Sequence, residues 1–341
     1  MLRPAFGLSD AMPVDLPRIG LGTAALAGLF QAVDRDTAME TLQVAWSLGI
    51  RYFDTAPHYG QGKAERRLGD FLSTQEPGSY IVSTKVGRVL SPSALPHRAL
   101  NGFVEPLPFD QRYDYSRDGI MRSYEDSLQR LGLNRVDMLF VHDIGMRTHP
   151  VHHQTHLDAL RTSGFRALEE LKRSGAISKI GIGVNEVEIC EEILSFQPLD
   201  IILLAGRYTL LDRSAEVTLL DMCKDAGTRL VIGGVFNSGI LATGASPDAH
   251  WDYGTPPEGI LRKVEVLTDL CNEYGVALPT AALAFPLHHP AVSTVLIGNS
   301  HPGRLKQNVS AIQAHKIPAD FWRRASEIAT MQPSDPRATL G

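Results

Sequence analysis

Short apolar runs rich in β-branched residues alternate with helix-like segments along almost the whole chain, and this alternation most constrains its fold. Most of the runs are continuously hydrophobic, which is typical of parallel strands covered on both faces by helices. The sequence predicts eight strands, at Ile19–Leu26, Arg51–Ala56, Tyr80–Val86, Val136–His142, Lys179–Val184, Ile201–Tyr208, Arg229–Phe236 and Val292–Gly298.

The segments between these strands have the spacing of amphipathic helices. The first of them places Met39, Leu42 and Ala45 on one face after Asp36, a suitable N-cap. The predicted helices are Thr37–Leu48, Gly119–Leu131, Leu157–Ser174, Glu186–Phe196, Ala215–Ala226, Gly259–Tyr274, Thr280–His288, Pro302–Ala314 and Ala319–Thr330.

Eight strands in a strand–helix alternation, without a break in composition, predict an α/β protein with one closed (β/α)8 barrel domain over residues 1–341. An open doubly wound sheet is the alternative. Residues 87–117 contain four prolines and no periodic pattern, so we expect an inserted functional loop or lid there. A C-terminal helix at residues 319–330 closes the chain.

Composition and charge exclude several classes of function. The 341 residues carry a formal net charge of −5 with both signs interspersed, which argues against a nucleic-acid or anionic-membrane partner. No apolar run is long enough to span a membrane, and the first ten residues do not resemble a signal peptide. The three cysteines are far apart, as expected for reduced thiols. We therefore expect a cytoplasmic protein.

Four polar residues follow or end three consecutive predicted strands. Asp54, Lys85 and His142 lie at strand ends, and Tyr59 comes five residues after Asp54. In a (β/α) barrel the carboxyl ends of the strands surround the active site. Each residue alone has a structural explanation as a cap or an ion-pair partner, but their convergence favours catalysis.

The four side chains form a chemically consistent group. An unperturbed tyrosine has a pKa of about 10, and a neighbouring lysine ammonium favours its phenolate form. Asp54 would hold Lys85 in its charged form, and a neutral His142 could orient a substrate oxygen beside Tyr59. Such a group exchanges a proton at a carbonyl or carbinol oxygen. No activated serine or cysteine nucleophile and no metal-ligand set accompanies it.

Two further clusters of charged or titratable residues receive a simpler interpretation. The histidines after the fourth strand could bind zinc if a third ligand were present, but a solvated loop and helix start explain them better. A second group is interpreted as a solvated helix face. The clusters are His149, His152, His153 and His156, and Glu125, Asp126, Arg130 and Arg135.

The segments that carry the four residues resemble the signatures of the aldo-keto reductases. They are Asp54-Thr-Ala-Pro-His-Tyr59-Gly with Glu65-Arg-Arg-Leu-Gly69, Ser83-Thr-Lys85-Val, and Asp137-Met-Leu-Phe-Val-His142. The resemblance covers essentially residues 16–313. It implies that Tyr59 is the general acid/base, that Lys85 and Asp54 tune it, and that His142 positions the substrate. It also implies a nicotinamide cofactor that lies extended across the barrel mouth.

Gly20-Leu-Gly22-Thr23-Ala-Ala25 formally fits a dinucleotide-binding fingerprint, but the expected helix does not begin inside it. The family resemblance instead implies that Gly22 and Thr23 end the first strand beside the nicotinamide. Asn185 resembles the residue that holds the carboxamide of this ring. The loop of Phe236, Asn237, Ser238 and Gly239 is expected on the pyrophosphate side, with a plain turn as the alternative.

The segment after the eighth strand resembles the family's site for the adenosine phosphate. It includes Gly298, Asn299, Ser300, Arg304 and Asn308. Ser300 and the first amides of the following helix predict an anion site, and Arg304 can stack on adenine or pair with a phosphate. Many members that prefer NADP carry lysine where Asn299 stands, so the sequence favours NAD. NADP remains possible because of Arg304.

Three further stretches, at residues 113–131, 205–211 and 234–241, resemble the group that contains D-threo-aldose 1-dehydrogenases and pyridoxal 4-dehydrogenase. This implies NAD-dependent oxidation of the anomeric carbon of an L-fucose, L-galactose or D-arabinose type aldose to a lactone. The alternatives are oxidation of pyridoxal to 4-pyridoxolactone, a general NADPH-dependent carbonyl reductase, and a non-enzymatic regulator similar to potassium-channel β subunits. Arg207, near the end of the sixth strand, could contact the small-molecule substrate or the cofactor, or be structural.

Overall fold

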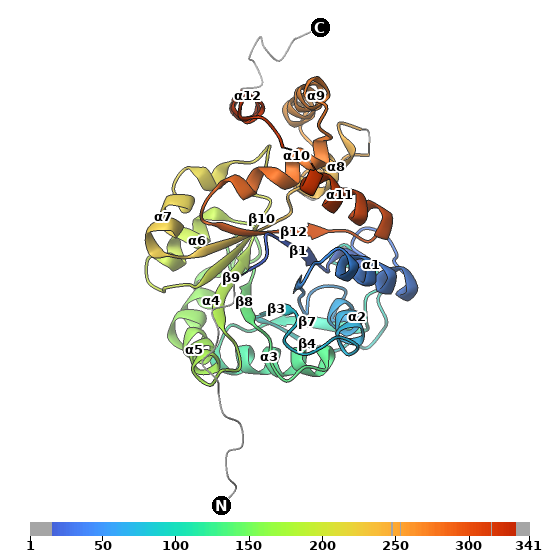
Figure 1. Ribbon diagram of the computed structural model, residues 1–341. Coiled ribbons are helices and arrows are strands. Elements are labelled where there is room, and N and C mark those ends of the chain that lie inside the picture. The colour runs from blue at the N-terminus through green and yellow to red at the C-terminus, as the bar shows by residue number, and fades with distance from the viewer. Residues whose placement is uncertain (1–15, 247, 253, 315, 332–341) are drawn as a thin grey trace, which may run out of the picture.

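The computed structural model describes residues 16–246, 248–252, 254–314 and 316–331. Its centre is a closed barrel of parallel strands in the order β1-β12-β11-β10-β9-β8-β3-β2, surrounded by helices (Figure 1). The predicted barrel is therefore confirmed, and the open sheet is excluded. The barrel strands are β1 (Ile19–Gly22), β2 (Tyr52–Asp54), β3 (Ile81–Val86), β8 (Met138–His142), β9 (Lys179–Val184), β10 (Ile201–Ala205), β11 (Arg229–Gly233) and β12 (Val292–Gly298).

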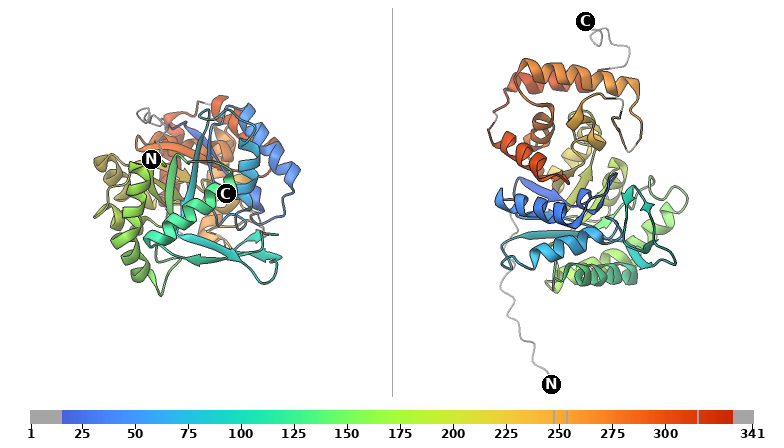
Figure 2. Two further views of the ribbon diagram at one scale, coloured as in Figure 1. Left: turned by 90° about the horizontal axis from the view of Figure 1, so that it is seen from below. Right: turned by 90° about the vertical axis from the view of Figure 1, so that its right-hand side faces the viewer.

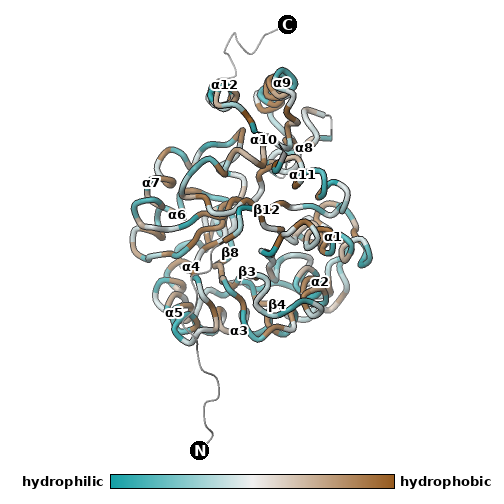
Figure 3. Tube along the Cα trace, viewed as in Figure 1, coloured by the Kyte–Doolittle hydropathy of each residue, from teal (hydrophilic) through white to brown (hydrophobic). Residues whose placement is uncertain are grey.

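The barrel is filled by large side chains that point inward from alternate strand positions. One buried cluster inside it consists of Tyr52, Met138, Phe140, Ile201, Leu203, Val231 and Leu296. A much larger cluster lies between the outer faces of the strands and the helices. The strands consequently bury both faces, which explains their continuously apolar sequences and their brown colour in Figure 3.

Two glycines in β9 make room inside this packing. A Cβ on Gly181 would lie 2.1 Å from the carbonyl oxygen of Ile201, a distance that no side chain tolerates. A Cβ on Gly183 would lie 3.2 Å from Cε of Lys85. A side chain at position 183 would therefore require a small displacement of Lys85.

The first helix, α1, begins earlier than predicted. Asp34, not Asp36, is its N-cap, and its carboxylate accepts a hydrogen bond of 2.7 Å from the Thr37 amide. The helices are α1 (Arg35–Ser47), α2 (Lys63–Leu72), α3 (Arg117–Leu131), α4 (His153–Ala159), α5 (Phe165–Arg173), α6 (Val187–Leu194), α7 (Leu219–Ala226), α8 (Ile240–Thr243), α9 (Glu258–Glu273), α10 (Leu278–Ala284), α11 (Pro302–Ala314) and α12 (Ala319–Thr330).

Two helices differ from the sequence-based expectation. Helix α2 was not predicted, because it is short, mostly polar, preceded by Gly60 and Gly62, and contains Gly69. The single helix expected at Leu157–Ser174 is divided into α4 and α5 by a π-helical turn at Leu160–Gly164. Gly164 in this turn is close to the chain before α3, since a Cβ there would lie 2.3 Å from the carbonyl oxygen of Tyr115.

The sequence showed no periodic pattern in residues 87–117, but the structure contains short strands there. These residues contain β4 (Arg88–Pro92) paired antiparallel with β7 (Phe109–Tyr113), and β5 (Ala99–Leu100) paired with β6 (Phe103–Val104). The β5–β6 pair contacts the loop after β1 through hydrogen bonds from Phe30 N to Gly102 O and from Val104 N to Gly28 O. The prolines lie at strand ends and turns, where they interrupt the pattern but not the pairing.

Helices α9 and α12 lie together on one side of the molecule, outside the ring of barrel helices (Figure 2). Lys263 Nζ in α9 donates a hydrogen bond of 2.7 Å to the carbonyl oxygen of Ala329 in α12. Within the described ranges, the structure contains no helix that is long and apolar enough to cross a membrane.

Replacing Gly181 with alanine should destabilise the barrel by about 1–3 kcal/mol, because the added methyl group overlaps the β10 backbone. Chemical unfolding of the purified variant measures this loss. Gly298→Ala is the matched control, since a Cβ at Gly298 meets nothing within 4 Å and should change stability little. Equal stability of the two variants would contradict the close approach of β9 and β10.

Candidate active site

The structure brings Asp54, Tyr59, Lys85 and His142 together at the carboxyl end of the barrel. Asp54 ends β2, Lys85 lies near the end of β3, and His142 ends β8. Lys85 Nζ donates hydrogen bonds to Asp54 Oδ2 at 2.7 Å and to Tyr59 Oη at 3.0 Å. The ring of His142 lies edge-on to that of Tyr59, with 6.0 Å between the centroids.

Lys85 and Asp54 form an ion pair that is almost completely buried, with side chains 1% and 3% exposed. Burial lowers the pKa of Lys85 and raises the pKa of Asp54, and the attraction between the two charges opposes both shifts. A third hydrogen bond, from Lys85 Nζ to the carbonyl oxygen of Thr55 at 2.9 Å, leaves the ammonium fully coordinated.

Two residues that the sequence analysis missed hold Asp54 from the other side. Ser83 Oγ donates to Asp54 Oδ1 at 2.7 Å, and Tyr52 Oη lies 3.0 Å from Ser83 Oγ. Since the hydroxyl proton of Ser83 is used on the carboxylate, Tyr52 donates to Ser83. The signal was available in the period of two along a strand, which places Tyr52 with Asp54 and Ser83 with Lys85 on the inward face.

A second polar group, also missed, lies beside His142. His58 Nδ1 accepts a hydrogen bond of 2.9 Å from Arg88, and its ring centroid lies 5.7 Å from that of His142. Burial, followed by the charge of Arg88, lowers the pKa of His58 to about 3. The same two causes lower the pKa of His142 well below its usual range. Both imidazoles are therefore neutral near pH 7.

Gly22 and Gly298 lie side by side at the floor of the barrel mouth. The two are register partners in β1 and β12, and Gly22 also pairs with Asp54 of β2. No atom lies within 3.8 Å of a Cβ built on either glycine, and the position at Gly298 is open. Thr23 is buried, and its hydroxyl donates to the Asp54 carbonyl oxygen at 2.9 Å. Its side chain is therefore used within the protein.

Arg207 is fixed by a network that favours its structural interpretation. Its Nε donates to the carbonyl oxygen of Asn185 at 2.8 Å. Its two other nitrogens pair with Asp212 at 3.1 Å and with Asp252 at 3.0 Å. Asp252 also pairs with Arg147 at 2.6 Å. Arg207 therefore joins the loops after β9, β10 and β11, and holds the backbone at Asn185 in place.

In the loop after β11, the side chain of Asn237 is engaged within the protein. That side chain is buried, accepts from Thr209 Oγ1 at 2.6 Å and donates to the carbonyl oxygen of Gly206 at 3.2 Å. Phe236 has right-handed backbone angles, whereas Asn237 and Ser238 have φ values of 45° and 59°. The amides of Asn237 and Gly239 donate within the turn, to the carbonyl oxygens of Gly234 at 2.9 Å and Phe236 at 3.0 Å.

The start of α11 has the residues of the predicted phosphate site, with some side chains already engaged. Asn299 Oδ1 accepts from the His301 amide at 2.8 Å, and Ser300 Oγ accepts from Gln31 at 3.1 Å. Arg304 is exposed on the first turn of this helix, and Asn308 is partly exposed one turn further. A helix start with an exposed arginine can hold a phosphate.

The two simpler interpretations need correction at single residues. His149 is buried, not solvated, and its Nε2 lies 2.8 Å from Tyr115 Oη. Arg130 pairs with the fully buried carboxylate of Glu65, which also accepts from Thr84 at 2.7 Å. Among the residues that the structure describes, no group of three or more histidine, cysteine, aspartate or glutamate residues has a metal-binding arrangement.

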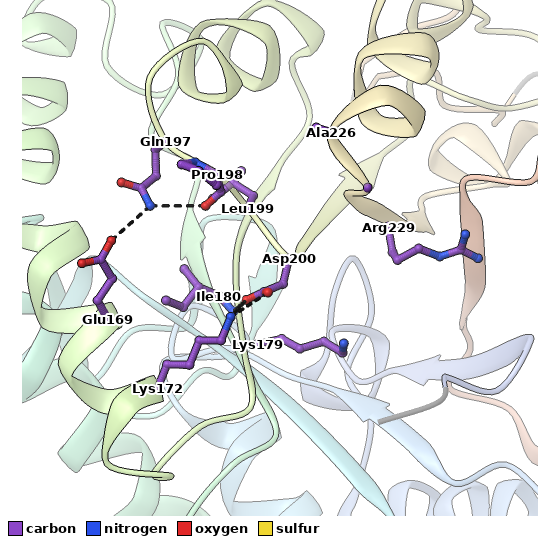
Figure 4. A pocket seen from close by; sticks show the side chains of 11 residues that line it. Glu169, Lys172, Lys179, Ile180, Gln197, Pro198, Leu199, Asp200, Ala226 and Arg229 are labelled. Carbon is purple, nitrogen blue, oxygen red and sulfur yellow. Dashed lines mark hydrogen bonds and ion pairs between the residues drawn. The ribbon is translucent and has the colours of Figure 1, made fainter. Parts of the chain in front are cut away.

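A hollow at the opposite end of the barrel is lined by residues near the amino ends of β9, β10 and β11 (Figure 4). Lys172 Nζ bonds both carboxylate oxygens of Asp200, at 2.7 and 2.6 Å. Asp200 also accepts from the Ile180 amide at 2.8 Å. These bonds connect α5, β9 and β10. The polar residues that line the hollow therefore have a structural role, which is to stabilise this end of the barrel.

The model of the Aldo/keto reductase family matches residues 18–330. Pyridoxal 4-dehydrogenase of Microbacterium luteolum is 46% identical, over 89% of this chain and 91% of that protein. D-threo-aldose 1-dehydrogenase of a Pseudomonas species is 38% identical, over 92% and 94%. Among solved structures, an aldo-keto reductase of Bacillus halodurans in its holo form superimposes with a TM-score of 0.72, over 92% and 93% of the two chains, at 24% identity.

The family match over nearly the whole chain and the identity with two dehydrogenases confirm the resemblance given by the strand-end motifs. The chain belongs to the aldo/keto reductase family and is an oxidoreductase of the class that uses a nicotinamide cofactor.

Proposed function

We propose that this enzyme is an NAD-linked dehydrogenase that oxidises a cyclic hemiacetal to a lactone. The observation that carries the proposal is the hydrogen bond from the buried Lys85 ammonium to the Tyr59 hydroxyl, with His142 beside it. The names of the 46% and 38% identical relatives, which act on pyridoxal and on aldoses, support this substrate class. Pyridoxal and aldoses share the cyclic hemiacetal form.

In the proposed mechanism Tyr59 accepts the proton of the hemiacetal hydroxyl. Lys85 favours the phenolate form of Tyr59 through its charge and its hydrogen bond. Asp54, held by Ser83, keeps Lys85 charged and aimed at Tyr59. His142, as a neutral imidazole, donates a hydrogen bond to the same substrate oxygen. A bound nicotinamide would supply the acceptor for the hydride that leaves the substrate carbon.

The residues around the mouth fit an extended dinucleotide. Gly22 and Gly298 leave space for a flat ring, and Arg207 holds the backbone at Asn185, the residue proposed to bind the carboxamide of that ring. The loop of Phe236, Asn237, Ser238 and Gly239 is assigned to the pyrophosphate side by the family resemblance alone, and the start of α11, with Asn299, Ser300, Arg304 and Asn308, suits the adenosine end. Asn299 carries no charge for a 2′-phosphate, which supports NAD over NADP.

The hemiacetal to be tested first is pyridoxal, followed by the aldoses. Sequence motifs alone had favoured an aldose, but the relative named for pyridoxal has the higher identity, 46% against 38%. A panel of pyridoxal, L-fucose, L-galactose and D-arabinose with NAD should give turnover of at least one compound and a lactone product. Activity confined to the reduction of nitrobenzaldehyde with NADPH would instead establish a general carbonyl reductase.

Tyr59→Phe should lower kcat by about 10²–10⁴-fold, because the variant has no group to take the substrate proton. Its affinity for NAD, measured by quenching of protein fluorescence, should stay within about twofold of the wild type. Near-normal turnover by the variant would show that another group transfers the proton.

Asn299→Lys should raise the ratio of kcat/KM with NADP to that with NAD by about tenfold, or ~1.4 kcal/mol, through a new charge for the 2′-phosphate. Asn299→Ala is the matched control, since it removes the hydrogen bond to the His301 amide without adding charge. An equal change of the ratio in both variants would show that Asn299 does not face the 2′ position.

A further inference from the structure

The hairpin of β4 and β7, which follows β3, brings the buried Arg88 close to His142. Arg88, the first residue of β4, has a side chain only 5% exposed and forms an ion pair with Asp143. Its guanidinium also donates to His58 Nδ1 at 2.9 Å and to Gln111 Oε1 of β7 at 3.2 Å. An arginine is seldom buried to this extent unless its charge is paired.

Asp143 is placed beside His142 by an unusual backbone conformation. It directly follows His142 at the end of β8 and has a φ of 45°, which is rare outside glycine. Its Oδ2 lies 3.4 Å from His142 Nε2. Tyr115 Oη, at the far end of the hairpin, donates to the carbonyl oxygen of His142 at 2.8 Å. Arg88 at the start of the hairpin and Tyr115 just after its end therefore both bind the turn formed by His142 and Asp143.

A carboxylate so close to an imidazole would normally favour the imidazolium cation. Here the same carboxylate oxygen is engaged by Arg88. The groups that face His142 are Lys85 from β3, Tyr59 and His58 from the turn after β2, Arg88 from β4, and Asp143 itself. Of these, Lys85 and Arg88 carry positive charge and oppose a third cation, whereas Asp143 favours it.

Arg88 also fixes the protonation state of a second histidine, His58. Because its Nδ1 accepts a hydrogen bond from the Arg88 guanidinium, His58 is held as the neutral tautomer with its proton on Nε2. In His142, Nδ1 is buried and has no hydrogen-bond partner in the described structure, so the neutral ring carries its proton on Nε2. The distance of 3.4 Å from Nε2 to Asp143 Oδ2 is longer than a normal hydrogen bond, so this proton can be donated to the substrate oxygen.

We propose that Arg88 is a positioning residue that keeps His142 neutral and oriented, by neutralising Asp143 and by adding a positive charge of its own. This inference rests on the proposed function, in which a neutral His142 donates one hydrogen bond to the substrate oxygen. It gives the hairpin an electrostatic role in the chemistry beyond covering the pocket. Without Arg88, the free carboxylate of Asp143 would draw a proton onto His142.

The test compares Arg88→Met, Arg88→Lys and the double variant Arg88→Met/Asp143→Asn, using any substrate that the wild type oxidises. The proposed oxidation needs the phenolate of Tyr59, so the first ionisation on the acid limb of the kcat/KM profile belongs to Tyr59. In Arg88→Met a second ionisation, that of His142, should appear below it, so that the slope of the limb rises from about one to about two and activity there falls about tenfold per pH unit more than in the wild type. Arg88→Lys, which keeps the charge, should retain most of the wild-type profile. The double variant, which removes the carboxylate as well, should return the slope toward that of the wild type.

A second measurement reads the imidazole directly and does not depend on turnover. In histidine-labelled wild type, the NMR signal of His142, assigned with His142→Gln, should not titrate between pH 7.5 and about 5. In Arg88→Met it should titrate within this range. Titration of wild-type His142 near pH 6.5, or an acid limb with the wild-type slope in Arg88→Met, would overturn the proposal. Absence of turnover with every hemiacetal would contradict the proposed function, whereas the NMR result still decides the role of Arg88.

Discussion

The structure depends most on one buried charge, the ammonium of Lys85 inside the barrel mouth. Removing an ammonium from water costs several kcal/mol unless its protons find acceptors. Here the three acceptors are Asp54 Oδ2, the Thr55 carbonyl oxygen and the Tyr59 hydroxyl. All three come from β2 and the turn that follows it, so the pairing of β2 with β3 is what makes the charge tolerable. The same three bonds define the geometry of the proposed proton transfer.

The Asp54 carboxylate is in turn part of a longer chain of hydrogen bonds into the barrel. Tyr52 donates to Ser83, and Ser83 donates to Asp54. Burial raises the pKa of Tyr52 well above its usual value, so this hydroxyl remains a donor at any physiological pH. The proposed reactive tyrosine and this inert one thus lie at the two ends of a single connected network. The reactivity proposed for Tyr59 rests on its contact with the Lys85 ammonium, which Tyr52 does not have.

The sequence was sufficient to predict the barrel and the convergence of Asp54, Tyr59, Lys85 and His142. Both predictions use only residues that are close in the sequence, namely the period of each strand and the residues at which it ends. Arg88, Asp143 and His58 were not predicted, because their meeting requires the hairpin to fold back over the mouth. Pairing of β4 with β7 joins residues far apart in the chain, and no local pattern records it. The same limit explains Arg130, whose partner Glu65 lies on a helix that the sequence did not predict.

The side chain of Lys85 packs closely against position 183 of β9, where a Cβ would lie 3.2 Å from its Cε and require a small displacement. Strands β3 and β9 are not neighbours, since β8 lies between them. Positions 85 and 183 are therefore coupled through shared volume rather than through a bond. A longer side chain at either one uses space that the other already fills, so their substitutions are not additive. Among related barrel proteins, we therefore expect substitutions at positions 85 and 183 to occur together or to be absent at both.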